Sequence, residues 1–358
     1  MPNPKEIAAL TINGQKYEDW TSVMVEVRIT EAFPIFQFDC SEFDESNRKA
    51  SLSTVINNMK IKPGDVVDVT LAGQQIVRGY VTERHVAYDA RNHAVRIIGV
   101  GKTFDLVTSS VWSQGGSYDN QSWEQMARAV IAPVGVELKV KGQIDATPYK
   151  QIQVQPGELI ASTLERYARQ RNILLGSTAK GELLAIGDHD ASEDDKLIEG
   201  VNIERFAGVI KDDNVYKKIY AIGQKVSDDS SFGDQSNKLV GKAEGSSTRE
   251  RTRVTVMDVS DDKHGAQQRA DMEKLFTEGA TVEHNVTVQG WLRGNGGLWE
   301  AGKYYWVRSP MALTDKLLGC KSIVYSQDNS NGTTTTLTMV LPVSMKGKPD
   351  FSGTSPTT

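Results

Sequence analysis

The chain has 358 residues, 39% of them hydrophobic and 24% charged, and a net charge of −5. This length predicts two to four domains of ordinary globular composition, and the acidic balance excludes a dedicated nucleic-acid binder, which needs a basic surface. No apolar run reaches the ~20 residues that cross a bilayer, and the first residues lack a signal-peptide pattern, so cytoplasmic synthesis is expected.

The first hundred residues have the pattern of a small β domain. Asn13-Gly14 is a strong hairpin turn signal, and the apolar residues alternate between Val23 and Ile29, so that they share one sheet face. Pro63-Gly64-Asp65 separates this run from further alternating segments. Several strands at short spacing predict a β-barrel-like domain over residues 1–102.

A helical period replaces the strand pattern in residues 103–190. Ser122 and Gln125 have the spacing of a capping box, and Gly135 ends the helix that follows. A second helix is expected from Pro156 onward. Short apolar runs on either side of residues 180–181 predict a hairpin, so this region is interpreted as an α/β domain.

The segment 191–278 is predicted to hold strands and a helix around a mobile loop. A strand pattern runs from Val215 to Ile222, and a helix is expected over residues 264–277. Residues 227–250 are polar and rich in glycine and serine, which is typical of a long loop.

The last part of the chain returns to short apolar runs separated by glycines. Ser330-Asn331-Gly332 is a clear hairpin turn, and residues 279–345 are predicted to form a second β-barrel-like domain. Residues 346–358 are predicted to be a disordered tail. The fold class is therefore α+β and mostly β, and the two β domains are candidates for distant copies of one fold.

Histidines and carboxylates do not form a recognisable metal site in this sequence. None of the histidines pairs at helical metal-binding spacing. His189, between Asp188 and Asp190, is the best metal candidate, but further ligands are missing nearby, and a solvated turn is the favoured interpretation. The acidic run 188–213 lacks a calcium-loop spacing, so it is interpreted as a solvated face or as a channel lining that repels DNA.

Other candidate features also have structural explanations. The glycine-rich stretch Gly294–Gly297 is expected to be a hairpin turn and not a phosphate loop, because no Gly-x-x-x-x-Gly-Lys run is present. The tryptophans are expected in cores or interfaces, and Cys40 and Cys320 as buried free thiols. No catalytic, cofactor-binding or metal residue is assigned.

Ordered motifs over residues 5–342 resemble the Mu-type phage baseplate hub proteins. They are Leu10-Thr-Ile-Asn13-Gly14-Gln-Lys-Tyr17-x-x-Trp20-Thr-Ser22-Val23, Pro63-Gly64-Asp65, Val69-x-Leu71-Ala72-Gly73, Gly79-Tyr80-Val81, Val86-Ala87-Tyr88-Asp89-Ala90, Asp105-Leu106-Val107-x-Ser109-Ser110, Gln155-Pro156-Gly157-Glu158, Leu164-Glu165-Arg166-x-Ala168-Arg169, Leu298-Trp299-x-x-Gly302, Leu317-Leu318 and residues 334–342.

The resemblance implies a structural protein of a contractile tail, similar to the lower ring of the type VI secretion spike. It implies a homotrimer whose two β domains per chain build a pseudo-sixfold ring around a channel for DNA. The expected partners are further copies of the chain, the central spike, the tail tube or distal tail protein and other baseplate proteins, with no specific nucleic-acid binding and no cofactor. The alternatives are a tail-associated cell-wall hydrolase and a glycan-binding β protein.

Overall fold

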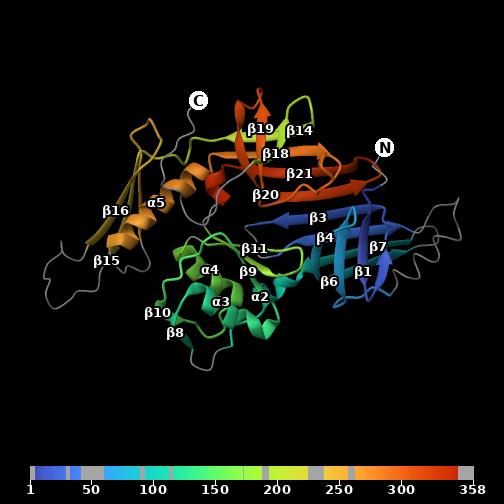
Figure 1. Ribbon diagram of the computed structural model, residues 1–358, viewed down its shortest axis with the longest axis horizontal. Helices are drawn as coiled ribbons and strands as arrows, with labels where there is room; N and C mark the ends of the chain where they lie inside the picture. Colours follow the sequence, from blue (N-terminus) through green and yellow to red (C-terminus); the bar gives the residue numbers. More distant parts are fainter. Residues whose placement is uncertain are drawn as a thin grey trace.

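The computed structural model describes residues 5–29, 33–41, 60–88, 93–112, 116–171, 173–187, 193–224, 238–256 and 263–345. Within these ranges the chain is mostly β with a few helices, and its strands form one 13-stranded sheet and three smaller sheets (Figure 1). No helix of the described residues is long and apolar enough to span a membrane. His189 and the tail 346–358 lie outside the described residues.

The N-terminal part of the large sheet, here called the first lobe, is built from seven strands. They are β1 (Ala8–Ile12), β2 (Gln15–Tyr17), β3 (Ser22–Arg28), β4 (Ile35–Ser41), β5 (Val66–Leu71), β6 (Gln74–Tyr88) and β7 (His93–Gly101). The alternation of apolar residues places Val23 and Val25 in the core, as predicted. The hairpin at Asn13-Gly14 is confirmed, and both residues have the positive φ angles that such a turn requires.

The middle of the chain folds into a compact unit with its own core. Its elements are η1 (Lys102–Phe104), α2 (Asp105–Thr108), β8 (Ser117–Gln121), α3 (Trp123–Ile131), η2 (Ala132–Val134), β9 (Leu138–Lys141), β10 (Tyr149–Gln153), α4 (Ile160–Gln170), β11 (Leu174–Ser177) and β12 (Leu183–Ile186). The Ser122–Gln125 capping box at the start of α3 is confirmed, and Trp123 is fully buried in the core of this unit. The β11–β12 hairpin is also confirmed.

An arm of three strands and one helix extends from the rest of the molecule. It consists of β15 (Lys218–Gln224), β16 (Lys238–Glu244), β17 (Thr252–Val256) and α5 (Lys263–Gly279), and α5 packs against β15 and β16 (Figure 1). The prediction of a loop over 227–250 is wrong for residues 238–244, because they form β16, which pairs with β15 along its full length; residues 245–250 are irregular as predicted, and residues 227–237 lie outside the described residues. Pairing with a neighbouring strand makes this segment a β-strand in spite of its polar composition.

The C-terminal part of the large sheet, here called the second lobe, begins earlier than predicted. Its elements are β13 (Glu193–Ile198), β14 (Ile203–Ile210), β18 (Val282–Gln289), β19 (Tyr304–Ser309), β20 (Thr314–Asp328), β21 (Gly332–Val340) and η3 (Pro342–Met345). Strands β13 and β14 come from the segment 191–278, yet they pair with β19 and β18. The hairpin turn at Ser330–Gly332 is confirmed.

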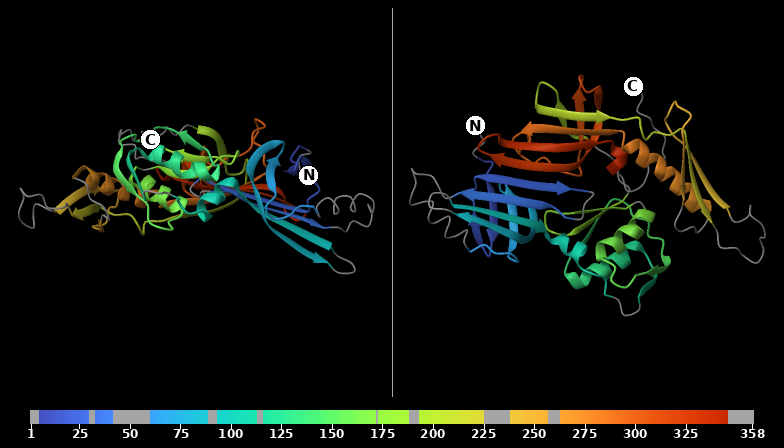
Figure 2. Two further views of the ribbon diagram at one scale, coloured as in Figure 1. Left: turned by 90° about the horizontal axis from the view of Figure 1, so that it is seen from below. Right: turned by 180° about the vertical axis from the view of Figure 1, so that it is seen from behind.

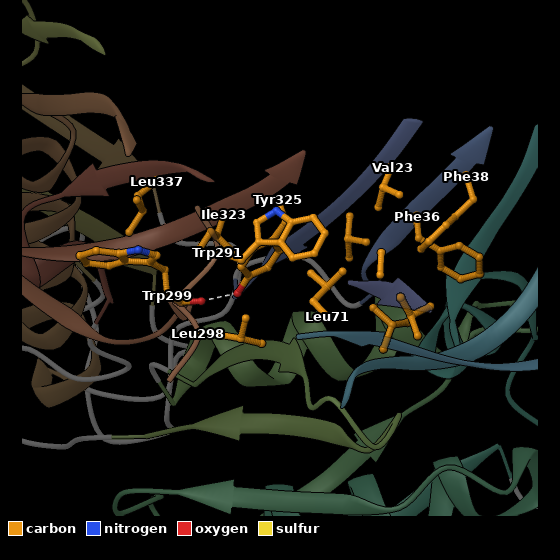
Figure 3. Packing of buried hydrophobic residues seen from close by; sticks show 14 of the residues in the cluster. Val23, Phe36, Phe38, Leu71, Trp291, Leu298, Trp299, Ile323, Tyr325 and Leu337 are labelled. Carbon is orange, nitrogen blue, oxygen red and sulfur yellow. Dashed lines mark hydrogen bonds between the residues drawn. The ribbon is translucent and has the colours of Figure 1, made fainter. Parts of the chain in front are cut away.

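The two lobes are not separate barrels, because β3 of the first lobe pairs directly with β20 of the second. The sheet therefore continues through β14-β18-β21-β20-β3-β4-β7-β6-β5-β1-β2. A single hydrophobic core extends beneath both lobes and includes Phe36, Trp291 and Tyr325 (Figure 3). The Tyr325 hydroxyl donates a hydrogen bond to the carbonyl of Trp299 within this core.

Candidate assembly surface

The face of the large sheet that turns away from the core is polar. The chain alternates along each strand, so the neighbours of core residues point to the opposite side. On β18 and β21 this side carries Asn285, Thr287, Thr336 and Thr338, which are half-buried or exposed. Thr287 bonds Thr336 at 3.0 Å, and Thr338 donates to Asn285 at 2.9 Å. We call this surface the polar face.

Two pairs of opposite charges on the polar face neutralise one another. Arg28 Nε lies 2.6 Å from Glu26 on β3. Arg96 Nε on β7 lies 2.6 Å from Asp39 on β4, and Asp39 raises the pKa of Arg96 through this hydrogen bond. A face with neutralised charges and satisfied hydroxyls offers no cluster of cations that could grip a polyanion.

Two long strands of the large sheet, β14 and β6, have open edges in the described part of the chain. Strand β14 pairs only with β18, so one side of its backbone has no partner strand. Strand β6 pairs with β5 only up to Tyr80, and Val81 is bonded to Gly64 and Asp65, so residues 83–87 have no strand on that side. The β6–β7 hairpin projects from the body at this place (Figure 2). Open edges of this length are templates for pairing with another chain.

Large apolar side chains are exposed along both open edges. Val86 on β6 is 50% exposed, and Val209 and Ile210 on β14 are 50% and 53% exposed. Tyr88, at the end of β6, is 79% exposed. An apolar side chain next to an open strand edge is typical of a surface that another chain covers.

A second exposed apolar group lies at the turn between β19 and β20. Met311 and Leu313 are 91% and 85% exposed, and Leu313 has a φ of 52°, which is unusual for a residue with a side chain. Val201, on the turn between β13 and β14, is 77% exposed. Glu199 connects the two turns, because its carboxylate accepts from Ser309 Oγ at 2.6 Å and from the Met311 amide at 3.3 Å. We call Met311, Leu313 and Val201 together the apolar tip.

The described acidic residues of the run 188–213 are mostly exposed, in agreement with the predicted solvated face, and residues 188–192 lie outside the described residues. Asp194 forms ion pairs with Arg293 and Lys303, and Asp212 pairs with Arg249. The described residues contain no group of three or more His, Cys, Asp or Glu side chains placed to hold a metal ion. The run is therefore a largely solvated segment from which Asp194 and Asp212 form ion pairs with other elements.

The glycine-rich stretch, the tryptophans and the cysteines considered in the sequence analysis have mainly structural roles. Gly296 donates its amide to the Arg293 carbonyl, which confirms the turn at Gly294–Gly297. Trp123, Trp291 and Trp299 are buried, whereas Trp112 is 84% exposed. Both cysteines are buried thiols outside any disulfide, as predicted, and burial raises the pKa of the Cys320 thiol.

Sequence reasoning did not single out the exposed residues of the two open edges. Val86 and Ile210 have the same alternating pattern as strand residues that are buried. Only the strand order of the sheet shows that β6 and β14 lie at edges. A long hairpin with apolar residues near its tip was the one signal that the sequence contained.

Two family profiles match adjacent parts of the chain. Residues 7–101 match "Mu phage baseplate assembly protein GpP-like, N-terminal". Residues 103–187 match "Baseplate hub protein gp44-like, second domain". The two profiles together cover the first lobe and the middle unit.

Known proteins extend the similarity over almost the whole chain. The chain is 25% identical to baseplate hub protein gp44 of Escherichia phage Mu over 299 residues, 81% of this chain and 76% of that protein. The crystal structure of the 43 kDa tail protein of prophage MuSo2 from Shewanella oneidensis is similar with a TM-score of 0.81 and 24% identity, over 96% of this chain and 100% of that one.

A more distant likeness is confined to the fold. It is to a type VI secretion component of E. coli, itself described as structurally similar to the T4 tail proteins gp27 and gp5, with a TM-score of 0.55, 10% identity and coverage of 96% and 80%. The profiles, the similarity to gp44 and the shared architecture agree with each other. The chain belongs to the gp44-like baseplate hub proteins of Mu-type phages and is a component of the phage tail baseplate.

Proposed function

We propose that three copies of the chain form the central hub ring of a contractile tail baseplate, and that this ring adapts the sixfold tail tube to the threefold central spike. The observation that carries the proposal is the continuous run of strands from β14 to β6, with an open edge on each of these two strands and a polar face between them. Two lobes in each of three chains supply six similar positions, which suits a boundary between sixfold and threefold symmetry.

A closed ring follows from the placement of the two edges. Strands β14 and β6 are the first and last strands of the run β14-β18-β21-β20-β3-β4-β7-β6, which contains the polar face and from which the path continues through β5, β1 and β2. An interface between two different edges is heterologous, and repeated copies of such an interface close into a ring when the rotation allows it. Ring closure would remove both open edges, which otherwise favour uncontrolled aggregation.

The polar face is the proposed lining of the central channel. Its hydroxyls, amides and paired charges would allow DNA to pass without being bound, because binding depends on unpaired cations that displace counterions from phosphates. The net charge of −5 agrees with a mildly acidic lumen. The role is structural, and we assign no catalytic residue to the chain.

The apolar tip is a proposed contact for other tail proteins. Three exposed apolar side chains on two turns that Glu199 connects would be buried on docking. Met311 and Leu313, between β19 and β20, lie outside both open edges, whereas Val201 lies two residues before β14, so the tip borders the β14 edge. The spike, the tail tube or distal tail protein and other baseplate proteins are the proposed partners, and the particle is made in the bacterial host.

Solution mass tests the proposal directly. Light scattering after size exclusion, repeated over a concentration series, is expected to give a mass of roughly 118 kDa, three times the 39.4 kDa chain. A mass that stays at one chain over the whole series, with and without a candidate spike trimer, would contradict the ring.

A further inference from the structure

The two lobes repeat one arrangement of strands. Along the large sheet, the order β14-β18-β21-β20 is followed by β3-β4-β7-β6. In each set the first two strands also come first in the chain, and the last two form a long hairpin. Strands β20 and β6 even have the same length of 15 residues. Strands β14, β18, β21 and β20 therefore correspond to β3, β4, β7 and β6.

The register repeats together with the order. Strand β6 has a bulge between Val81 and Glu83, opposite β7, and β20 has one between Cys320 and Ser322, opposite β21. When the two bulges are matched, Tyr80 corresponds to Gly319. Tyr80 pairs with Val66, the first residue of β5, and Gly319 pairs with Tyr304, the first residue of β19. This agreement outside the bulge fixes a residue-by-residue correspondence between the two lobes.

Within one chain the lobes meet through β20 and β3. In this junction Tyr325 lies opposite Val25, Ser326 opposite Met24, and Ser322 opposite Arg28. Tyr325 and Val25 are both fully buried there. In the repeat, β6 corresponds to β20 and β14 corresponds to β3, and β6 and β14 are the two long strands with open edges.

We infer that β6 of one copy pairs with β14 of the next copy in the register of the β20–β3 junction. The correspondence places Val86 opposite Gly208, Ala87 opposite Ala207, and Glu83 opposite Lys211 of the next copy. This inference rests on the proposed ring, to which it adds the partner strands and their register.

The side chains of the two edges agree with this pairing. Val86 is 50% exposed in the single chain and corresponds to Tyr325, which is fully buried in the existing junction. Ile210 is 53% exposed and corresponds to Val27, which packs against the core. Pairing would therefore turn these exposed apolar residues into an extension of the core.

Charge complementarity gives an independent argument. Glu83 corresponds to Ser322, and Lys211 corresponds to Arg28, so an acidic and a basic residue would meet across the two copies. Glu83 and Lys211 are both exposed in the single chain. Directly opposed unlike charges stabilise an antiparallel strand pair.

Disulfide cross-linking tests the register. Opposed residues in antiparallel strands have Cα atoms about 4.5–5.5 Å apart, which is within the range that a disulfide spans. We expect the full-length double variant Ala87→Cys/Ala207→Cys to give covalent dimers and trimers on a non-reducing gel after mild oxidation. A mixture of the two single variants should give dimers only, and each single variant alone should stay monomeric on the gel. The wild type is the control for the native cysteines, which are buried.

Two further cysteine pairs, one displaced from the inferred register and one within it, test whether the cross-link is specific. Ala87→Cys/Arg205→Cys is displaced by two residues, or about 7 Å along the strand, so it should cross-link at most a tenth as efficiently. Glu83→Cys/Lys211→Cys should cross-link as Ala87→Cys/Ala207→Cys does. A trimer by light scattering in which neither predicted pair cross-links, or in which the shifted pair cross-links equally well, would overturn the strand pairing and leave the ring intact. A monomer at every concentration with no cross-link would contradict both.

Discussion

At the residue scale, Glu6 attaches the N-terminal segment to the second lobe. Its buried carboxylate accepts hydrogen bonds from the amides of Trp291 at 2.8 Å and Leu292 at 3.0 Å. Replacement by alanine would leave both amide donors without this acceptor, at ~1–3 kcal/mol each. We therefore expect Glu6→Ala to lower the free energy of unfolding by roughly 2–6 kcal/mol, measured by urea unfolding with tryptophan fluorescence.

Glu6→Gln is the matched control for this prediction. Its side-chain carbonyl can still accept from one or both amides while the charge is removed, so the loss should be clearly smaller than for Glu6→Ala. Equal urea midpoints for wild type and Glu6→Ala would show that the carboxylate does not hold the two lobes together.

A second residue-scale prediction concerns pH. His284 is buried on β18, with Nδ1 at 3.1 Å from the Glu283 carbonyl and Nε2 at 3.0 Å from Thr314 Oγ1. Burial lowers its pKa below the ordinary value, and Lys316 acts in the same direction. Because the unfolded chain takes up a proton near pH ~6.5 while the folded chain resists it, stability should fall as pH decreases below that value.

The slope of this loss can reach about 1.4 kcal/mol per pH unit. We expect His284→Gln to remove that part of the slope, seen as a smaller difference between the free energies of urea unfolding at pH 7.5 and pH 5. Parallel curves for wild type and His284→Gln across this interval would assign the acid sensitivity to other groups.

At the element scale, the β6–β7 hairpin contains the projecting open edge. Val86→Lys places a charge where the corresponding Tyr325 is buried, so burial of that position in an assembly becomes unfavourable. We expect the variant to fold as a monomer, because Val86 is half exposed, but to weaken self-association tenfold or more in light scattering. Ile7→Lys, with a comparable exposure of 48% outside both edges, should associate like the wild type.

Local signals in the sequence predicted the elements better than their arrangement. The capping box at Ser122 and the turn at Asn13-Gly14 depend on neighbouring residues, and both were predicted correctly. Pairing between distant strands leaves no such local pattern, so β16 was taken for a loop and β14 was placed outside the second lobe. The assembly edges depend on that distant pairing, which is why sequence reasoning missed them.

At the scale of the whole molecule, a closed trimer repeats each contact between copies three times, so the small free energies of single contacts add up. An exposed ion pair contributes ~0.2–1 kcal/mol, but a closed trimer would contain the proposed Glu83–Lys211 contact three times. Glu83→Lys or Lys211→Glu should therefore weaken trimer formation by up to about a hundredfold, because three contacts amount to at most ~3 kcal/mol. Light scattering at low salt would measure this as an upward shift in the concentration at which the trimer appears.

The double charge swap separates a specific contact from a change in net charge. Glu83→Lys/Lys211→Glu has the charge of the wild type and restores opposed unlike charges, so it should recover most of the lost association. Raising the salt concentration should reduce the differences between all four proteins, because the residues are exposed and the interaction is screened. If the double variant associates no better than the single variants, Glu83 and Lys211 do not meet across copies, and the register inferred from the internal repeat is wrong at this pair.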